Sequence, residues 1–331
     1  MAAPFPDPLI IPPVSATHKQ TFILLHGRGS TAHKFGPVIL ETPLSQNDDN
    51  ENDTTPTPPT KAQTLQRLYP HAKFIFPSAP RSRAAIYKRY LIPQWFDCWH
   101  ADGPDSDAHE WMMVDGLQQT VAYIHALLRD EVSRVGAGNV VLGGISQGCA
   151  AGLVTLLLWE GERLGAFLGM CGWLPFRKGL AGVVDAWGRG MEEGAVSVTS
   201  ERGAREWEDS FDPFEHDSDE VEKAVKPTDV AAACVQSLLE QLELEQACIS
   251  PASRPPAFDT PVFLGHGDED EKVPMRLGVE AARCLKAIKI DTSWNKYQGL
   301  GHWYSGPMLT DMVTFLRSHT DWGQNGETKL L

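Results

Sequence analysis

Apolar residues gather in short runs along the chain, and between these runs they return at every third or fourth position. Six runs stand out, the first five nearly uninterrupted and the last alternating with polar residues: 21–25, 73–76, 139–142, 166–170, 261–264 and 292–297. Apolar runs of this length are typical of strands buried on both faces, as in a parallel sheet. We therefore expect a strand at each of these places.

Helical spacing fills several of the stretches between the runs. Apolar residues recur three and four positions apart in four segments: 114–128, 150–159, 277–288 and 308–316. This spacing places them on one face of a helix. Strands that alternate with such helices indicate an α/β fold, with a doubly wound and mostly parallel sheet. We expect a single domain of this kind over residues 1–331.

Two segments break the alternation. Residues 45–61 are polar and rich in proline and threonine, which predicts a disordered loop. Residues 176–258 separate two late strands by far more than one crossover helix requires, and within them only 230–244 has helical spacing. This insertion could form a lid over a site, or it could be a solvated excursion with no part in function. The sequence leaves both readings open.

The net charge of −14 is concentrated in these two segments. Residues 48–53 carry four acidic side chains, and residues 185–223 carry thirteen acidic against four basic ones, so together they supply −13. The rest of the chain is almost neutral. An acidic chain repels phosphates, which argues against a nucleic acid as partner.

Other bulk features concern the compartment. No stretch approaches the roughly 18 consecutive apolar residues of a membrane helix, so we expect no integral membrane segment. The first residues carry no basic region of the kind that opens a signal peptide. The six cysteines are scattered and form no Cys-x-x-Cys pair, which is typical of reduced thiols. A cytoplasmic protein is the expectation.

The candidate chemistry centres on Gly144-Ile145-Ser146-Gln147-Gly148. This Gly-x-Ser-x-Gly motif follows a predicted strand and precedes a predicted helix, which is the context in which the serine is a nucleophile on a tight turn. Glycines on either side leave room for such a turn. The positive N-terminus of the following helix then points at negative charge that develops on a substrate. Ser146 is therefore the predicted nucleophile.

A serine hydroxyl needs a base and an acid that orients the base. In this strand–turn–helix context the chain order is serine, acid, histidine. His302 follows the last predicted strand between glycines, and it is the predicted base. Asp268 and Asp270 both follow the preceding strand. Asp270 is the favoured acid, with Asp268 as the alternative, because an Asp at the latter place often caps its own turn.

Two backbone N–H groups must stabilise the oxyanion. The residue after the nucleophile, Gln147, supplies one. The other is expected from the loop after the first predicted strand, His26-Gly27-Arg28-Gly29-Ser30, where glycines allow a close approach of the backbone. The amide of Arg28 is the predicted second donor.

Taken together, these motifs resemble the phospholipase/carboxylesterase family of α/β-hydrolases, which includes the acyl-protein thioesterases. The likeness covers about residues 20–176 and 259–318, and its segments are Leu25-His26-Gly27-x-Gly29, Trp95-Phe96-Asp97, Gly144-x-Ser146-Gln147-Gly148, Gly172-Trp173-Leu174-Pro175, His266-Gly267-Asp268-x-Asp270-x-x-Val273-Pro274 and Gly301-His302. The resemblance implies Asp270 as the acid and the Arg28 amide as an oxyanion donor. It also implies that no metal or organic cofactor is needed.

The same resemblance implies substrates with an acyl group in ester or thioester linkage, such as S-acylated proteins, lysophospholipids or small carboxylic esters. Arg28 stands where the family usually has an apolar residue, and Ser30 where an aspartate is common, so the entrance to the site differs in charge. An apolar acyl groove could be lined by the following residues: Ile86, Leu91, Ile92, Trp95, Phe96 and Trp99. Alternatives are an esterase acting on a small metabolite or a lysophospholipid, and a binding protein on a hydrolase scaffold.

Overall fold

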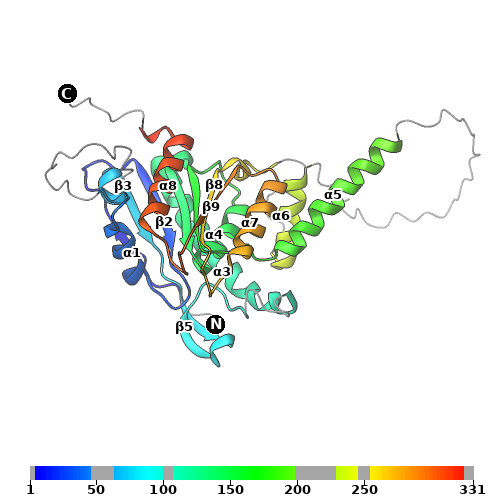
Figure 1. Cartoon of the computed structure of the whole chain (residues 1–331), viewed down its shortest axis with the longest axis horizontal. Coiled ribbons are helices and arrows are strands. Elements are labelled where there is room, and N and C mark those ends of the chain that lie inside the picture. The colour runs from blue at the N-terminus through cyan, green and yellow to red at the C-terminus, as the bar shows by residue number, and fades with distance from the viewer. Residues whose placement is uncertain (1–3, 46–62, 100–106, 198–228, 245–253, 324–331) are drawn as a thin grey trace, which may run out of the picture.

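The computed structural model describes residues 4–45, 63–99, 107–197, 229–244 and 254–323. Its centre is a seven-stranded sheet (Figure 1). In spatial order the strands are β1 (Leu9–Ile11), β3 (Ala72–Phe76), β2 (Gln20–Leu25), β6 (Val140–Ile145), β7 (Ala166–Met170), β8 (Val262–Gly267) and β9 (Thr292–Tyr297). The edge strand β1 runs antiparallel to β3, and the other pairs are parallel.

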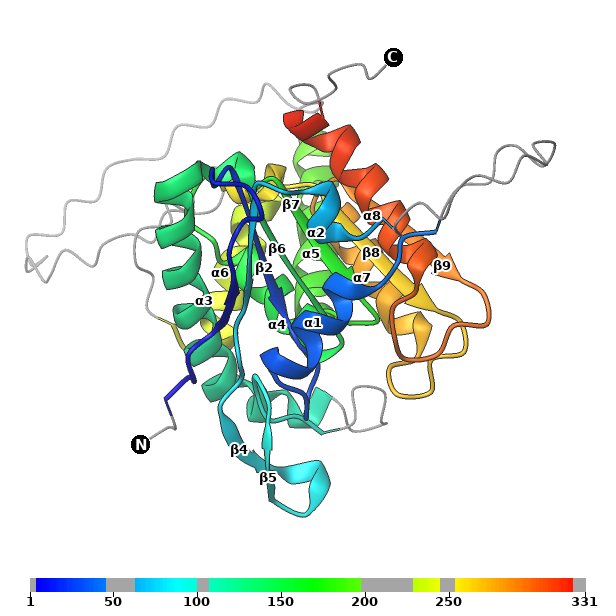
Figure 2. The same ribbon diagram turned by 90° about the vertical axis from the view of Figure 1, so that its left-hand side faces the viewer.

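Helices cover both faces of this sheet (Figure 2). One face carries α1 (Ala32–Glu41), α2 (Leu65–Leu68) and α8 (Gly306–His319). The other carries α3 (Val114–Val135), α4 (Gln147–Leu157), α6 (Val230–Gln241) and α7 (Met275–Ala287). Shorter 3₁₀ turns complete the described chain: Ala85–Tyr87, Asp107–Met113, Ala137–Asn139, Pro256–Asp259 and Asp321–Gly323. The expected doubly wound α/β architecture is confirmed.

The two-sided burial of the strands explains their uninterrupted apolar sequence. Along β2, Phe22 and Leu24 pack into the core beneath α1 and α8, whereas Ile23 and Leu25 pack into the core beneath α3 and α4. Successive side chains of a strand point to opposite faces, so a strand covered on both sides needs apolar residues at every position. All six predicted strands lie where the apolar runs placed them.

The pattern gave no indication of several elements, among them β1, α1 and the hairpin of β4 (Arg81–Ala84) and β5 (Tyr90–Pro93). The strand β1 has only three residues and lies at the sheet edge. Helix α1 contains Gly36 and Pro37, and the aromatic ring of Phe76 occupies the space that a Cβ at Gly36 would need, with contacts down to 2.8 Å. The small hairpin projects from the body (Figure 2).

The insertion at 176–258 contributes two helices to the described structure, whereas the sequence predicted only the one at 230–244. The N-cap of α6 is Asp229, whose side chain accepts a hydrogen bond from the Ala231 amide at 2.7 Å. The apolar face of this helix joins the core beside α3 and α4. Helix α5 (Arg177–Ser197) packs on α6 and α7, and its far end extends away from the body (Figure 1). Of the predicted loop at 45–61 only Ser45 is described, and residues 198–228 and 245–253 of the insertion lie outside the described residues.

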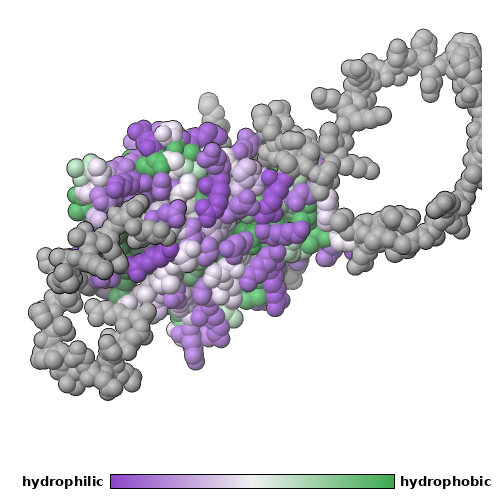
Figure 3. All heavy atoms as spheres, turned by 90° about the horizontal axis from the view of Figure 1, so that it is seen from above, coloured by the Kyte–Doolittle hydropathy of each residue, from purple (hydrophilic) through white to green (hydrophobic). Residues whose placement is uncertain are grey.

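The face seen in Figure 3 is largely hydrophilic, with apolar residues in small separate patches. Within the described residues, no helix combines the length and the apolar content that a membrane crossing requires.

Candidate active site

Ser146 lies on a sharp turn between β6 and α4. Its backbone has φ 58° and ψ −124°, a region that residues with a Cβ rarely occupy, and such strain costs on the order of 1–3 kcal/mol. The turn is possible because Gly148 passes so close to β2 that a Cβ there would lie 2.4 Å from the Leu25 carbonyl oxygen. A Cβ on Gly144 would likewise lie 2.6 Å from the Gly148 carbonyl carbon. The turn therefore requires glycine at both positions, because a Cβ at either one would clash with the backbone.

The three residues predicted for the catalytic centre form a continuous hydrogen-bonded chain. The Nε2 atom of His302 lies 2.8 Å from the Ser146 Oγ, and its Nδ1 atom lies 2.7 Å from Asp270 Oδ2. Since a carboxylate only accepts, Nδ1 carries the proton of a neutral ring and Nε2 is free to accept the serine proton. Residues 146, 270 and 302 come from the loops after β6, β8 and β9, which open at the same edge of the sheet.

Asp270 is held by four donors. Its Oδ1 accepts the backbone amides of Lys272 and Val273, both at 2.9 Å, and its Oδ2 accepts His302 and also Nε2 of His266 at 3.1 Å. Burial alone would raise the pKa of this carboxyl, but the bonds from His266, His302 and the Val273 amide outweigh it and hold the pKa well below its usual range. Asp270 is therefore ionised and fixed in orientation.

Asp268, the alternative acid, faces a different turn. Its Oδ1 accepts the Gly299 amide at 2.7 Å and its Oδ2 pairs with Lys296 at 3.1 Å. These bonds tie the loop after β8 to the turn after β9. The structure thus places Asp270, and not Asp268, against the imidazole of His302.

A buried network fixes the loop after β2 next to the nucleophile. The Nδ1–H of His26 donates to the Gly27 carbonyl at 2.8 Å, its Nε2 accepts the Ala79 amide at 3.1 Å, and its own carbonyl accepts the indole N–H of Trp95 at 2.7 Å. Burial lowers the pKa of His26 to about 4, against a smaller opposing effect of its bond to Gly27. His26 is therefore a neutral structural residue.

The side chain of Gln147 belongs to the same network. Its Oε1 accepts the Trp95 amide at 3.0 Å, and its Nε2 donates to the Phe96 carbonyl at 2.8 Å. This pair of bonds ties the segment after β5 to the first turn of α4. The sequence predicts a role only for the backbone amide of Gln147, because side-chain partners some fifty residues upstream leave no local signal.

The two predicted oxyanion donors flank the nucleophile. The Gln147 amide is the first N–H of α4, and such groups have no partner within their own helix. The Arg28 amide follows Gly27, where a Cβ would lie 3.3 Å from the Ser146 Cβ, so the loop passes close to the serine. Within the described part of the chain, neither amide donates a hydrogen bond to another protein group. Both are thus free to bind a substrate oxygen.

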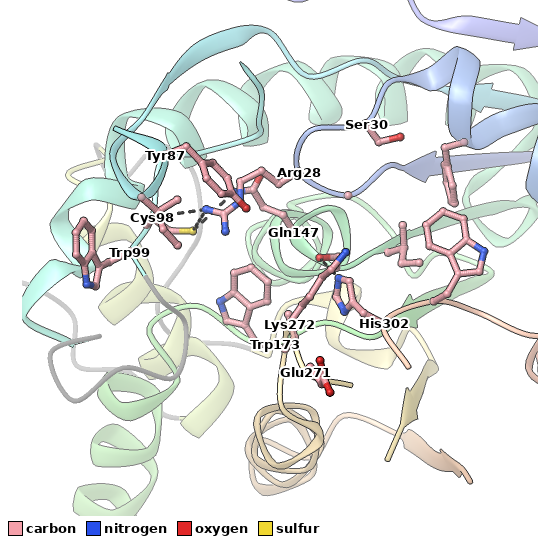
Figure 4. A pocket seen from close by; sticks show the side chains of 17 residues that line it. Arg28, Ser30, Tyr87, Cys98, Trp99, Gln147, Trp173, Glu271, Lys272 and His302 are labelled. Atoms are coloured by element: carbon pink, nitrogen blue, oxygen red, sulfur yellow. Dashed lines mark hydrogen bonds between the residues drawn. The ribbon is translucent and has the colours of Figure 1, made fainter. Parts of the chain in front are cut away.

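A pocket of about 550 Å³ opens beside Ser146. Figure 4 shows its walls. Aromatic and apolar groups share the lining with two basic side chains and one acidic one: Gly27, Arg28, Ser30, Phe35, Ile86, Tyr87, Cys98, Trp99, Ile145, Ser146, Gln147, Trp173, Glu271, Lys272, Val273, His302 and Trp303. The pocket is large enough for a small acyl substrate.

The six residues predicted for an acyl groove divide into three sets. Ile86 and Trp99 line the pocket, whereas Trp95 and Phe96 are each only 1% exposed and lie beneath it in the network with Gln147. Ile92 is half-buried and Leu91 exposed on β5, and neither is part of the pocket wall. A buried indole positions the wall but offers no surface to a ligand. No described residue of 176–258 lines the pocket either, and the lid stays a prediction.

Within the described residues, Cys171, His266 and Asp270 are the one group whose types and spacing could suit a metal ion. Their ligand atoms are already engaged. The Cys171 thiol donates to the Trp303 carbonyl at 3.2 Å, His266 bonds to Asp270, and Asp270 also holds His302. Burial raises the pKa of the Cys171 thiol to about 12, which keeps it protonated. The group therefore fits a hydrogen-bonded support beneath the catalytic centre.

The sheet order, the strained serine turn and the loops that gather at one sheet edge define an α/β-hydrolase. The model of the phospholipase/carboxylesterase family matches residues 59–188 and 230–320. The chain belongs to this family of hydrolases.

Relatives and solved structures agree with that assignment. An acyl-protein thioesterase 1 of Gibberella zeae is 25% identical over 311 residues, which is 94% of each chain. A second, from Yarrowia lipolytica, is 29% identical over 52% of this chain and 65% of its own. Among solved structures, Zea mays acyl-protein thioesterase 2 superposes with a TM-score of 0.56 at 18% identity, covering 94% of this chain and 98% of its own. The esterase PE8 gives 0.55 at 19% identity, covering 95% and 98%.

Proposed function

We propose that the protein hydrolyses carboxylic ester or thioester bonds through an acyl-enzyme intermediate on Ser146. The observation that carries the proposal is the hydrogen-bonded chain from Ser146 through His302 to Asp270 at the wall of an open pocket. A serine oxygen 2.8 Å from an imidazole that has an ionised carboxylate behind it meets the geometric requirement for nucleophilic catalysis.

Each step follows from these positions. The Ser146 oxygen attacks the acyl carbon while its proton passes to His302 Nε2, and the carbonyl oxygen gains a negative charge. The amides of Arg28 and Gln147 bind that charge, and each such donor is worth about 3 kcal/mol. When this tetrahedral intermediate collapses, the alcohol or thiol leaves and takes the proton from His302. Water then attacks the acyl-enzyme by the same route, and Asp270 stabilises the imidazolium in both halves.

The substrate class rests on the family and on the pocket. Several relatives carry the name acyl-protein thioesterase 1, which supports an acyl thioester on a protein as one candidate. The mixed polar and aromatic walls of the pocket suit a small ester equally well. Comparing p-nitrophenyl esters of short acids with a palmitoyl thioester would separate the two.

A fluorophosphonate probe tests the reaction class directly. Labelling of wild-type protein that disappears in Ser146→Ala, together with loss of ester turnover, is the expected result. Unlabelled wild-type protein would contradict catalysis and favour a binding protein on the same scaffold. Turnover that survives Ser146→Ala would show that the nucleophile lies elsewhere.

A further inference from the structure

The pocket beside Ser146 contains an arginine side chain that has no ionic partner in the described part of the chain. Arg28 is half-buried, its Nη1 points at the carbonyl oxygen of Cys98 at 3.4 Å and at the Cys98 sulfur at 3.2 Å, and its guanidinium lies 5.3 Å from the centre of the Tyr87 ring. A guanidinium has five N–H donors, and these contacts involve one nitrogen. The remaining donors on this pocket wall are available to a ligand.

The carboxylate of Asp97, next to Cys98 in the chain, bonds to another part of the backbone. Both oxygens of Asp97 accept the Ala85 amide, at 3.1 and 3.2 Å, and this holds the turn between β4 and β5. A charged group that is partly removed from water and has no ionic partner is unfavourable in free energy. The half-buried guanidinium of Arg28 therefore favours an anionic ligand. Arg28 is also held at two points, by Tyr87 and Cys98, which fixes where its charge lies.

A second cation lines the same pocket from another loop. Lys272 follows β8 and lines the pocket with an exposed side chain, as does its neighbour Glu271 (Figure 4). Lys272 makes no ion pair within the described residues. The wall of this acidic protein's pocket therefore carries two basic side chains against one carboxylate.

The direction of the reaction decides which part of a substrate meets Arg28. The leaving atom must face His302 Nε2, because it receives its proton there. The acyl chain, bonded to the same carbon, extends away from His302. Arg28 lies across the pocket from His302 (Figure 4), so it faces the acyl chain.

We propose that the pocket takes an acyl group that itself carries a carboxylate, as in a half-ester or half-thioester of a dicarboxylic acid, with Arg28 as the main anchor and Lys272 as a second. The inference deepens the proposed hydrolysis and rests on it. A long unsubstituted acyl chain would instead lie against a charged guanidinium and leave its donors without a partner.

The test compares two esters of equal chain length. The ratio of kcat/KM for mono-p-nitrophenyl adipate to that for p-nitrophenyl hexanoate isolates the effect of the terminal carboxylate, because the leaving group and chain length are shared. We expect a ratio above one in the wild-type protein. It should fall about 10- to 100-fold in Arg28→Gln. Added salt should also lower it, since screening weakens the attraction.

Lys272→Gln should lower the same ratio by a smaller factor. Lys286→Gln, which removes an exposed cation on α7 away from the pocket, is the matched control and should leave it unchanged. The Arg28 amide also serves the oxyanion hole, and the ratio cancels any change that affects both esters alike. The rate of fluorophosphonate labelling reports whether each variant keeps a folded site.

The anion could instead belong to the leaving group. Butyrate esters of 4-hydroxybenzoate and of its methyl ester test this, because there the charge lies on the phenol. If Arg28→Gln changed this second ratio and left the adipate ratio intact, the acyl assignment would be overturned. A wild-type adipate ratio below one would also overturn it, while hexanoate hydrolysis through Ser146 would leave the proposed function standing. Failure of both esters together with absent labelling would remove the proposed function itself.

Discussion

His266 Nε2 lies 3.1 Å from Asp270 Oδ2, the same oxygen that accepts Nδ1 of His302 at 2.7 Å. The His266 ring is 1% exposed, and the same Nε2 lies 2.8 Å from the Val273 carbonyl oxygen, so its one N–H is shared between two acceptors. A second, buried histidine thus shares the acid with the first. His266 fixes the orientation of the Asp270 carboxylate and stabilises its negative charge, so it is a positioning residue for His302.

Replacing His266 is expected to change the pH profile as well as the rate. In His266→Phe, Oδ2 loses one donor, so Asp270 becomes more basic and stabilises the protonated form of His302 more strongly. The acid limb of the pH profile of kcat/KM should therefore move to higher pH. The value of kcat should also fall about tenfold, because the carboxylate loses its fixed orientation. His266→Gln keeps an amide donor at the Nε2 position and should restore both in part. A lower rate with an unmoved acid limb would indicate a purely structural role.

Gly278 on α7 should be sensitive to a single methyl group. A Cβ there would lie 2.6 Å from His266 Nδ1 and 2.7 Å from the Trp294 ring. Gly278→Ala is expected to displace the His266 ring, lowering stability by about 1–3 kcal/mol and reducing kcat. Gly182→Ala on α5 is the control, because no atom lies within 4 Å of its Cβ position, and it should be neutral or stabilising in urea unfolding.

The two aspartates after β8 should behave differently. Asp270→Asn removes the charge behind His302 and should lower kcat about 10³- to 10⁴-fold with little change in KM. Asp268→Asn loses its pairing with Lys296 and weakens its bond to the Gly299 amide, so it should affect activity only a few-fold. Steady-state kinetics on a p-nitrophenyl ester would decide. Equal losses in the two variants would contradict the assignment of Asp270.

The side chain of Gln147 should be needed for stability. Gln147→Ala leaves the Trp95 amide and the Phe96 carbonyl without partners, which costs about 1–3 kcal/mol for each buried group. At a pH where its carboxyl is protonated, Gln147→Glu offers an acceptor to the Trp95 amide and an O–H donor to the Phe96 carbonyl, so its loss of stability should lie between those of wild type and alanine. Urea unfolding measures the difference, and a neutral alanine variant would argue against the network.

His26 should make the stability of the protein depend on pH. Its folded pKa of about 4 lies below the value of about 6.5 expected in the unfolded chain. Between these values the unfolded state binds a proton that the folded state does not, so stability is complete above pH 6.5 and falls by about 3 kcal/mol as the pH approaches 4. His26→Gln should flatten this slope in urea unfolding, and the exposed His33→Gln should not. An unchanged slope in His26→Gln would contradict the buried neutral state.

The fold was readable from the chain because burial on both faces demands apolar residues at every strand position. The turn at Ser146 was readable for a related reason. Its glycines are required by contacts to β2 and α4 that no side chain could tolerate, so the steric demand appears directly in the sequence. The edge strand β1 was not predicted, because its three residues are too few to show a recognisable pattern of apolar positions.

The prediction of residues that line an acyl groove was correct only in part. Trp95 and Phe96 are apolar and near the site, but hydrophobicity does not distinguish a side chain that lines a cavity from one packed beneath it. Their backbone bonds to Gln147 turn both rings into the core, while Ile86 and Trp99 reach the pocket.

The sequence by itself determined the strand order along the chain, the serine turn, and the presence of an acid and a histidine downstream, because each depends on local pattern or on steric limits within a few residues. Only the tertiary structure decided that Asp270 rather than Asp268 meets His302, that His266 supports the acid, and that Arg28 stands without an ionic partner in the described part of the chain. These relationships join loops far apart in the chain, and their distances follow from how the strands are ordered in the sheet.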